Sequence, residues 1–215
     1  MFSRNADGST TVRANFLGID DANFRGGARA ALGDVNRDGT PDVAVAAGFG
    51  GGPRTAVFGG PSVLAGAPAR LVNDFFAFPG TDALNLRNGA FVSIGDVTGD
   101  GFGDLIFGGG PGGAPRVFVL SGALVTAGNV TGAQAAPVAN FFVANNSNDR
   151  GGARVGVVDA NGDGRADLAV GSGIGAPARV RVYLAQNVTP NGEPTPFQDL
   201  FPFTGEVLTD GIYVS

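Results

Sequence analysis

Three segments of the chain carry oxygen-bearing side chains at alternating positions, a spacing that suits a hard cation. Positions one, three, five and nine of the three segments are, in order, Asp34, Asn36, Asp38 and Asp42; Asp96, Thr98, Asp100 and Asp104; and Asp159, Asn161, Asp163 and Asp167. A glycine follows position five each time and permits a sharp turn. Because Ca²⁺ takes about six to eight oxygen ligands, we predict three calcium sites. The backbone carbonyl at position seven would add a ligand in each loop, from Thr40, Phe102 and Arg165.

Two other interpretations of these loops are weaker. An EF-hand begins in the same way, but its twelfth position is a bidentate Glu and helices flank it. Here position twelve is Val45, Phe107 or Val170, and both flanks read as strands. A metal-free Asp-Gly hairpin is the simpler alternative. Three copies, each with three carboxylates, disfavour it, because close carboxylates repel by about 1 kcal/mol per pair in water.

The composition excludes most other chemistry. The 215 residues include no Cys, no His and no Lys, so thiolate, imidazole and Schiff-base catalysis are ruled out, as are zinc sites built from Cys and His. The chain has 38 Gly, far above the average of about 7%, which indicates many tight turns between short strands. The formal net charge of −5, with scattered arginines, predicts no nucleic-acid partner. No apolar run is long enough to span a membrane.

The Asp loops belong to a repeat of 62 or 63 residues, the separations between the leading aspartates at 34, 96 and 159. Each unit holds four short apolar runs joined by Gly-rich turns, and no segment has a sustained helical period over ten residues. Four-stranded units in tandem are typical of a β-propeller. A β-sandwich, the alternative, does not predict identical loops at such regular spacing.

We therefore predict one all-β domain, residues 1–215, built of propeller blades with four antiparallel strands each. The full blades are at residues 24–85, 86–148 and 149–208, with partial blade strands at 1–23 and 209–215. Since propellers need about four to eight blades to close, this set should not close alone. We expect either a longer array or a homo-oligomer that completes the ring, because exposed strand edges pair readily.

Two further positions recur in every unit. The first is an arginine twenty residues after the leading aspartate, where we expect a salt bridge to an Asp. These arginines are Arg54, Arg116 and Arg179. The second is one column on the first strand of each unit, where the varied residue types indicate tolerance rather than a shared role. Its members are Arg29, Phe91, Arg154 and Tyr213.

These segments resemble FG-GAP repeats, the calcium-binding blades of integrin α-subunit propellers that many bacterial surface proteins share. The Asp loops match the family's Asp-x-Asx-x-Asp-Gly-x-x-Asp pattern, and its Gly-Ala-Pro appears at residues 113–115 and 175–177. The family's Phe-Gly is replaced by Gly26-Gly27, Asn88-Gly89 and Gly151-Gly152, so the aromatic residue is missing. The resemblance covers residues 24–215. It implies a ring of roughly seven blades in the complete protein, with calcium in hairpins on one face.

The resemblance implies little about the partner, because the family is defined by its scaffold. We predict a non-enzymatic module that binds about three Ca²⁺ and acts as a scaffold for a protein or glycan partner. We also predict an extracellular or cell-surface location, with a signal peptide absent from this sequence. Two alternatives stay open. One is a purely structural spacer in a surface protein. The other is a carbohydrate or phosphoester hydrolase that uses carboxylates outside the loops, namely Asp74, Asp82, Asp149, Asp199 and Glu206.

Overall fold

A computed structural model of the chain describes residues 1–203, 205 and 207–214. Its strands form three four-stranded antiparallel sheets and one two-stranded hairpin. The predicted all-β class and the four-stranded units are therefore confirmed. Glu206, one of the carboxylates considered for hydrolysis, and Ser215, at the end of the second predicted partial blade, lie outside the described residues.

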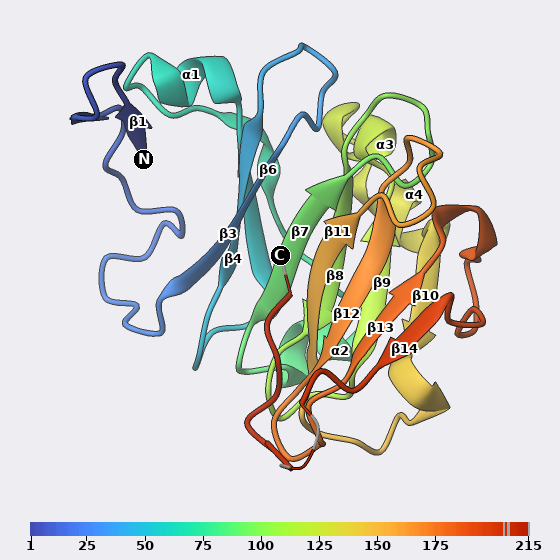
Figure 1. The fold of residues 1–215 in the computed structure, drawn as a ribbon. Coiled ribbons are helices and arrows are strands. Elements are labelled where there is room, and N and C mark those ends of the chain that lie inside the picture. Colours follow the sequence, from blue (N-terminus) through green and yellow to red (C-terminus); the bar gives the residue numbers. More distant parts are fainter. Residues whose placement is uncertain (204, 206, 215) are drawn as a thin grey trace.

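Each large sheet is a meander in which consecutive strands are neighbours (Figure 1). The first sheet contains β3 Ala28–Gly33, β4 Asp42–Ala47, β5 Arg54–Phe58 and β6 Arg70–Phe76. The second contains β7 Ala90–Gly95, β8 Asp104–Gly109, β9 Arg116–Leu120 and β10 Ala139–Phe142. The third contains β11 Ala153–Val158, β12 Asp167–Ser172, β13 Val180–Tyr183 and β14 Gln198–Leu200.

The second strand of each sheet is its most buried element. All six residues of β4 and of β8 are buried. Such strands are covered on both faces. In the sequence they therefore appear as short continuous runs of apolar and small residues rather than as alternating patterns. This explains why apolar runs bounded by Gly-rich turns were a sufficient signal for these strands.

Short helices occupy the connections between strands. They are α1 Gly60–Leu64, α2 Thr81–Asn85, α3 Gly122–Thr126 and α4 Val130–Ala135, with 3₁₀ turns at Val143–Asn145 and Ala185–Asn187. The sequence did not predict them, because five or six residues are too few to establish a helical period. Buried Val63 and Val125 anchor α1 and α3 to the core. The longest described helix has six residues, whereas a bilayer crossing needs about 20.

The three sheets pack face to face through two apolar clusters. Residues that alternate along a strand point to opposite faces, so the second sheet contributes to both clusters. Leu105 and Phe107 of β8 pack with the first sheet, while Ile106 packs with the third. The first strands β3, β7 and β11 lie next to one another, with β7 in the middle (Figure 1). The Asp loops follow directly from these first strands, so this packing also sets their spacing.

The outer face of the first sheet is covered by the N-terminal segment. This segment begins with a hairpin of β1 Phe2–Arg4 and β2 Thr10–Val12. It continues without strand structure to Ala14 and Ile19, which are buried in a cluster with β4 and β5. The ring of Phe16 packs edge-on against Phe58 at 4.7 Å.

The last described residues, 207–214, run along the third sheet. The N–H of Ile212 donates to the carbonyl of Ser172, the last residue of β12, at 3.0 Å. No strand is assigned to residues 209–214. Their position relative to the third sheet is nevertheless similar to that of β7 relative to the first sheet. In the described part of the chain the three sheets do not close into a ring.

Candidate metal centre

The three predicted loops lie side by side at one end of the sheets. They connect β3 to β4, β7 to β8 and β11 to β12. Backbone hydrogen bonds join neighbouring loops, from the N–H of Gly103 to the carbonyl of Asp34 at 2.7 Å and from the N–H of Ala166 to that of Asp96 at 2.9 Å. The guanidinium of Arg37 also lies 5.9 Å from the ring centre of Phe102. The fold therefore brings the predicted site residues into one continuous row of loops.

The carboxylate at position one shapes each loop. Asp34 accepts hydrogen bonds from the N–H groups of Asp38 and Gly39 at 3.1 and 2.8 Å. Asp96 accepts from the equivalent residues of the second loop at 3.1 and 2.8 Å, and Asp159 from those of the third at 3.1 and 3.0 Å. The tight turn thus forms through its own backbone donors, and this pair of hydrogen bonds is the same in all three copies.

Positions three and five contact each other in the first and third loops. The amide of Asn36 donates to the carboxylate of Asp38 at 2.9 Å, which also accepts from the N–H of Thr40 at 2.8 Å. These donors lower the pKa of Asp38. In the third loop, the N–H of Arg165 and the Asn161 amide lower the pKa of Asp163 in the same way. Both carboxylates are therefore charged at neutral pH.

The second loop differs at position three. The Thr98 hydroxyl donates to the leading carboxylate, Asp96, at 3.4 Å rather than to position five. Asp100 still accepts from the N–H of Phe102 at 2.9 Å. The loop keeps its shape, but it offers a hydroxyl oxygen where the other two loops offer an amide.

The aspartates at position nine are fully buried and clamp each loop to a distant turn. Asp42 accepts from the N–H of Val35 at 2.9 Å and from the N–H of Gly60, at the start of α1, at 2.8 Å. Asp104 and Asp167 repeat this bridge to the N–H groups of Gly122 and Ala185 at 3.0 and 2.7 Å. Sequence reasoning assigned these residues only to metal. The sequence feature that could have indicated this second contact is the small residue 18 positions after each of these aspartates.

Burial sets the electrostatics of position nine. It raises the pKa of Asp42, and it raises the pKa of Asp104 to about 6, against the opposing effect of the N–H donors. By their pKa, Asp42 and Asp104 are therefore harder to ionise than Asp38 and Asp163.

The donor set matches Ca²⁺ in kind. Each loop offers carboxylates at positions one and five and an amide or hydroxyl oxygen at position three. The carbonyls of Thr40, Phe102 and Arg165 accept no hydrogen bond among the described residues. No three acidic side chains in the described part of the chain gather closely enough to hold a metal alone. The position-nine carboxylates accept from backbone N–H groups in all three loops. An all-oxygen set of this kind fits Ca²⁺ better than Zn²⁺ or Cu²⁺.

The described carboxylates outside the loops that were considered for hydrolysis have structural partners. Asp74 pairs with Arg54 at 2.8 Å, Asp82 pairs with Arg116 at 2.7 Å, and Asp199 pairs with Arg179. The expected salt bridge at the repeated arginine is therefore present in all three units. The fourth carboxylate, on residue 149, accepts the N–H of residue 151 at 2.7 Å and caps a turn.

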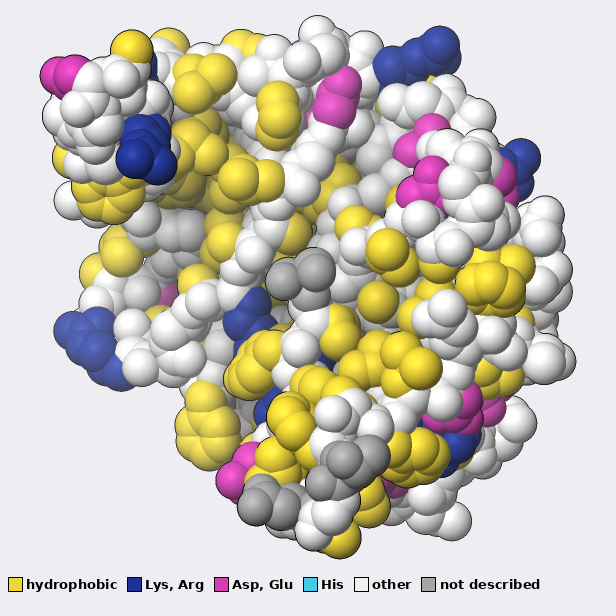
Figure 2. Space-filling view, in the orientation of Figure 1, with side chains coloured by type: hydrophobic (Ala, Val, Ile, Leu, Met, Phe, Trp, Pro, Cys, Tyr) yellow, Lys and Arg dark blue, Asp and Glu magenta, His cyan; other side chains and the backbone are white. Residues whose placement is uncertain are grey.

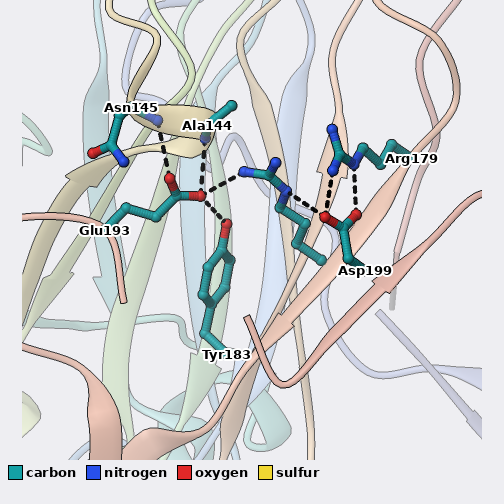
Figure 3. Close-up of polar contacts among 7 residues, drawn as sticks. Ala144, Asn145, Arg179, Tyr183, Glu193 and Asp199 are labelled. Atoms are coloured by element: carbon teal, nitrogen blue, oxygen red, sulfur yellow. Dashed lines mark hydrogen bonds and ion pairs between the residues drawn. The ribbon is translucent and has the colours of Figure 1, made fainter. Parts of the chain in front are cut away.

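A second polar cluster joins the second and third sheets (Figure 3). At its centre is Glu193, in the connection between β13 and β14, with 6% of its side chain exposed. Its carboxylate accepts from the N–H groups of Ala144 and Asn145 at 2.9 Å each. It also accepts from the Tyr183 hydroxyl and from Arg181 at 2.6 Å each. Burial raises the pKa of Tyr183, so its hydroxyl stays protonated as a donor.

Glu193 stabilises a strained piece of backbone. Ala144 and Asn145 have φ angles of 62° and 50°, in the left-handed region that non-glycine residues seldom adopt. Successive N–H groups in this region form an anion-binding nest, and the Glu193 carboxylate fills it. The sequence offered one weak signal, because Glu193 is one of only two Glu in an Asp-rich chain.

Replacing Glu193 by glutamine should destabilise the protein by about 3 kcal/mol. The change leaves the buried Arg181 without its nearest carboxylate and places an amide donor against the nest. The free energy of unfolding, from urea titration, measures the loss. Asp82→Asn is the matched control, because Asp82 pairs with Arg116 outside this cluster and has a side chain 41% exposed, and it should cost less than about 1 kcal/mol. Equal losses of unfolding free energy would show that the Glu193 cluster does not contribute more to stability than an exposed ion pair.

Comparison with known proteins places one segment in a family. Residues 26–62 match the FG-GAP repeat. No curated protein sequence matches the chain. Similar solved structures are the exotype rhamnogalacturonan lyase YesX and the rhamnogalacturonan lyase YesW, each with a TM-score of 0.46 and 13% identity. A Bacillus licheniformis rhamnogalacturonan lyase has a TM-score of 0.46 and 14% identity.

These alignments cover 92–95% of this chain but only 35–37% of the lyase chains, so the chain spans about a third of their length. The FG-GAP match contains the first Asp loop together with β3, β4 and β5. The segment at residues 26–62 is therefore an FG-GAP repeat, as the resemblance of the Asp loops predicted.

Proposed function

We propose that the chain is a calcium-binding β-propeller module that serves as a non-enzymatic scaffold for a protein or glycan partner outside the cell. Each of the three Asp loops would hold one Ca²⁺ through positions one, three and five and the carbonyl at position seven. The bound cation would neutralise the carboxylates that each loop concentrates. The first hairpin of each sheet would be stiffened as a result.

The observation that carries this proposal is the recurrence of one loop geometry in three consecutive sheets. The leading carboxylate accepts the same pair of N–H groups in each loop. Isolated Asp-Gly turns need no such repetition. Here the pair of hydrogen bonds is kept in all three loops while the residues at positions four and seven vary. The oxygen donors are therefore what the loops have in common.

The propeller arrangement is supported by contacts that repeat at each boundary between units. Gly89 lies against the carbonyl of Ala47 at the end of β4, and Gly152 lies against that of Gly109 at the end of β8. Gly211 lies against the carbonyl of Ser172 in the same way. The C-terminal segment therefore occupies the place that the first strand of a following blade would take, which fits an array of blades.

Calcium should raise the melting temperature of the protein strongly. A ligand at about 100 times its Kd adds about 2.7 kcal/mol per site, or about 5 °C or more for each occupied site in a domain of this size. Calorimetry with EDTA and then with excess Ca²⁺ measures the shift, and isothermal titration of the EDTA-treated protein should give about three sites.

Two variants make the calcium test specific. Asp38→Asn should remove about one site, because it replaces the charged ligand at position five of the first loop. Asp7→Asn is the matched control, since Asp7 is exposed and also accepts a hydrogen bond from a backbone N–H two residues on, but lies outside the loops. Identical melting curves in EDTA and in Ca²⁺ would refute the proposed calcium sites.

A further inference from the structure

The column on the first strands forms a ladder of alternating cations and rings. The guanidinium of Arg29 lies 4.1 Å from the ring centre of Phe91, and that of Arg154 lies 5.7 Å from the same ring. Arg154 also lies 4.2 Å from the ring centre of Tyr213. The varied residue types in this column, which indicated tolerance, therefore make up one contiguous structure that runs across all three sheets.

The two arginines in this ladder contact no carboxylate among the described residues. The other arginines on the strands of the three large sheets all pair with an acid, and they are Arg54, Arg70, Arg116 and Arg181. Arg29 is partly buried, and Arg154 is only 4% exposed. Burial and the neighbouring Arg154 cation lower the pKa of Arg29. Buried cations are costly unless they are paired, so this pair of positive charges calls for an explanation.

Backbone contacts account for only part of the arginine donors. Nη1 of Arg29 donates to the carbonyls of Asn88 and Ala90 at 3.1 and 3.2 Å. Arg154 donates to the carbonyls of Ser172 and Asp210 at 3.1 and 3.0 Å. Among the described residues Arg29 donates only through Nη1, which leaves its Nε and Nη2 without a protein acceptor. In the described part of the chain, Nε of Arg154 is likewise buried without one. The ladder therefore keeps unused donors and an uncompensated positive charge.

These donors border a small cavity whose lining includes aromatic rings. The cavity measures about 280 Å³ and is lined by both arginines, both rings of the ladder and the valines beside them. Figure 2 shows basic side chains set among hydrophobic ones beside the C-terminal segment. Ligand pockets begin at about 300 Å³, so this one suits a ligand of a single ring.

We propose that this cavity binds a ring-bearing carboxylate. The carboxylate would accept hydrogen bonds from Nε and Nη2 of Arg29 in the positive field of Arg154. The ring would lie against Phe91 and Tyr213, which offer apolar faces. An anionic ligand would supply the negative charge that the described residues do not provide, which explains why both arginines are tolerated in a partly buried column.

Titration calorimetry with benzoate and with glucuronate tests this binding, since both carry a carboxylate on a six-membered ring. Benzamide and glucose are the neutral analogues, and inorganic phosphate is the anion without a ring. We expect the carboxylates to bind more tightly than their neutral analogues and than phosphate. Whichever of the two binds more tightly then shows whether the natural ligand is aromatic or a sugar acid.

Variants separate a binding role from a purely structural one. Arg29→Gln should weaken carboxylate binding by about tenfold or more. Arg87→Gln, at an exposed arginine that does not line the cavity, should change it less than about twofold. Tyr213→Ala, at a side chain 73% exposed, should also weaken binding without unfolding the chain. The proposal is overturned if neither carboxylate binds better than its neutral analogue, if phosphate binds equally well, or if Arg87→Gln weakens binding as much as Arg29→Gln.

Discussion

Replacing Gly89 by alanine should destabilise the protein by more than about 4 kcal/mol, an exceptionally large loss for a single methyl group. A Cβ at this position would lie 1.7 Å from the carbonyl oxygen of Ala47, which belongs to the buried end of β4. Neither backbone can move freely, because both are held in packed sheets. The φ angle of +66° adds its own penalty of about 1–2 kcal/mol for a residue with a side chain.

Gly27 provides a matched control for this prediction. It occupies the same place in the first unit and has a φ of +72°, but an added Cβ there would meet nothing within 4 Å. Gly27→Ala should therefore cost only the conformational penalty of about 1–2 kcal/mol. Urea unfolding of both variants measures the two losses, and an unchanged m-value would show that the same transition is compared. Similar losses would mean that the close approach between units contributes little.

The repeat explains why so much of the fold followed from the sequence. A strand of five or six residues is a weak signal alone, but the same order of runs and turns appears three times. The recurring arginines Arg54 and Arg116 are the first residues of β5 and β9. Repetition averages out the local ambiguity that limits single-sequence prediction.

Residue spacing identified the donors of the loops but not the direction in which they point. Alternating oxygens indicate a cation site, and the same pattern leaves open whether a carboxylate faces a metal or a backbone N–H. Asp104 and its equivalents face N–H groups 18 residues away, a contact that depends on how β8 and β9 pair. Register and packing decide such contacts, and a local motif contains neither.

The Glu193 cluster was unpredictable for a related reason. Its partners Ala144 and Asn145 lie 49 and 48 residues away in sequence, in a different unit. Nothing about an Ala-Asn pair indicates a left-handed turn until a carboxylate is in place to accept both N–H groups. The contact also breaks the repeat, because it uses a long connection that differs between units. A contact that is unique to one unit has no repeated counterpart in the sequence, so it could not be predicted in this way.

Replacing Asp104 by asparagine should cost about 2 kcal/mol even when no calcium is present. The carboxylate accepts hydrogen bonds from the N–H groups of Val97, Thr98 and Gly122 at 2.9 to 3.0 Å, and its residue is fully buried. Asparagine has one acceptor oxygen and an NH₂ group, so at least one buried N–H donor would face another donor. An unsatisfied buried donor costs about 1–3 kcal/mol. The raised pKa of Asp104 means that burying its charge offsets part of this loss.

Measuring this loss in EDTA at pH 7.5 isolates the clamp from the metal. The carboxylate is charged at that pH, because the pKa of Asp104 is about 6. Asp100→Asn, in the exposed part of the same loop, is the control and should cost less than about 1 kcal/mol in EDTA. With calcium added, the loss from Asp100→Asn should grow, because it removes a charged ligand. If Asp104→Asn instead matched the wild type in EDTA and lost stability only with calcium, position nine would be a metal ligand and not a clamp. The two variants thus separate what holds the loop to its sheet from what the loop binds.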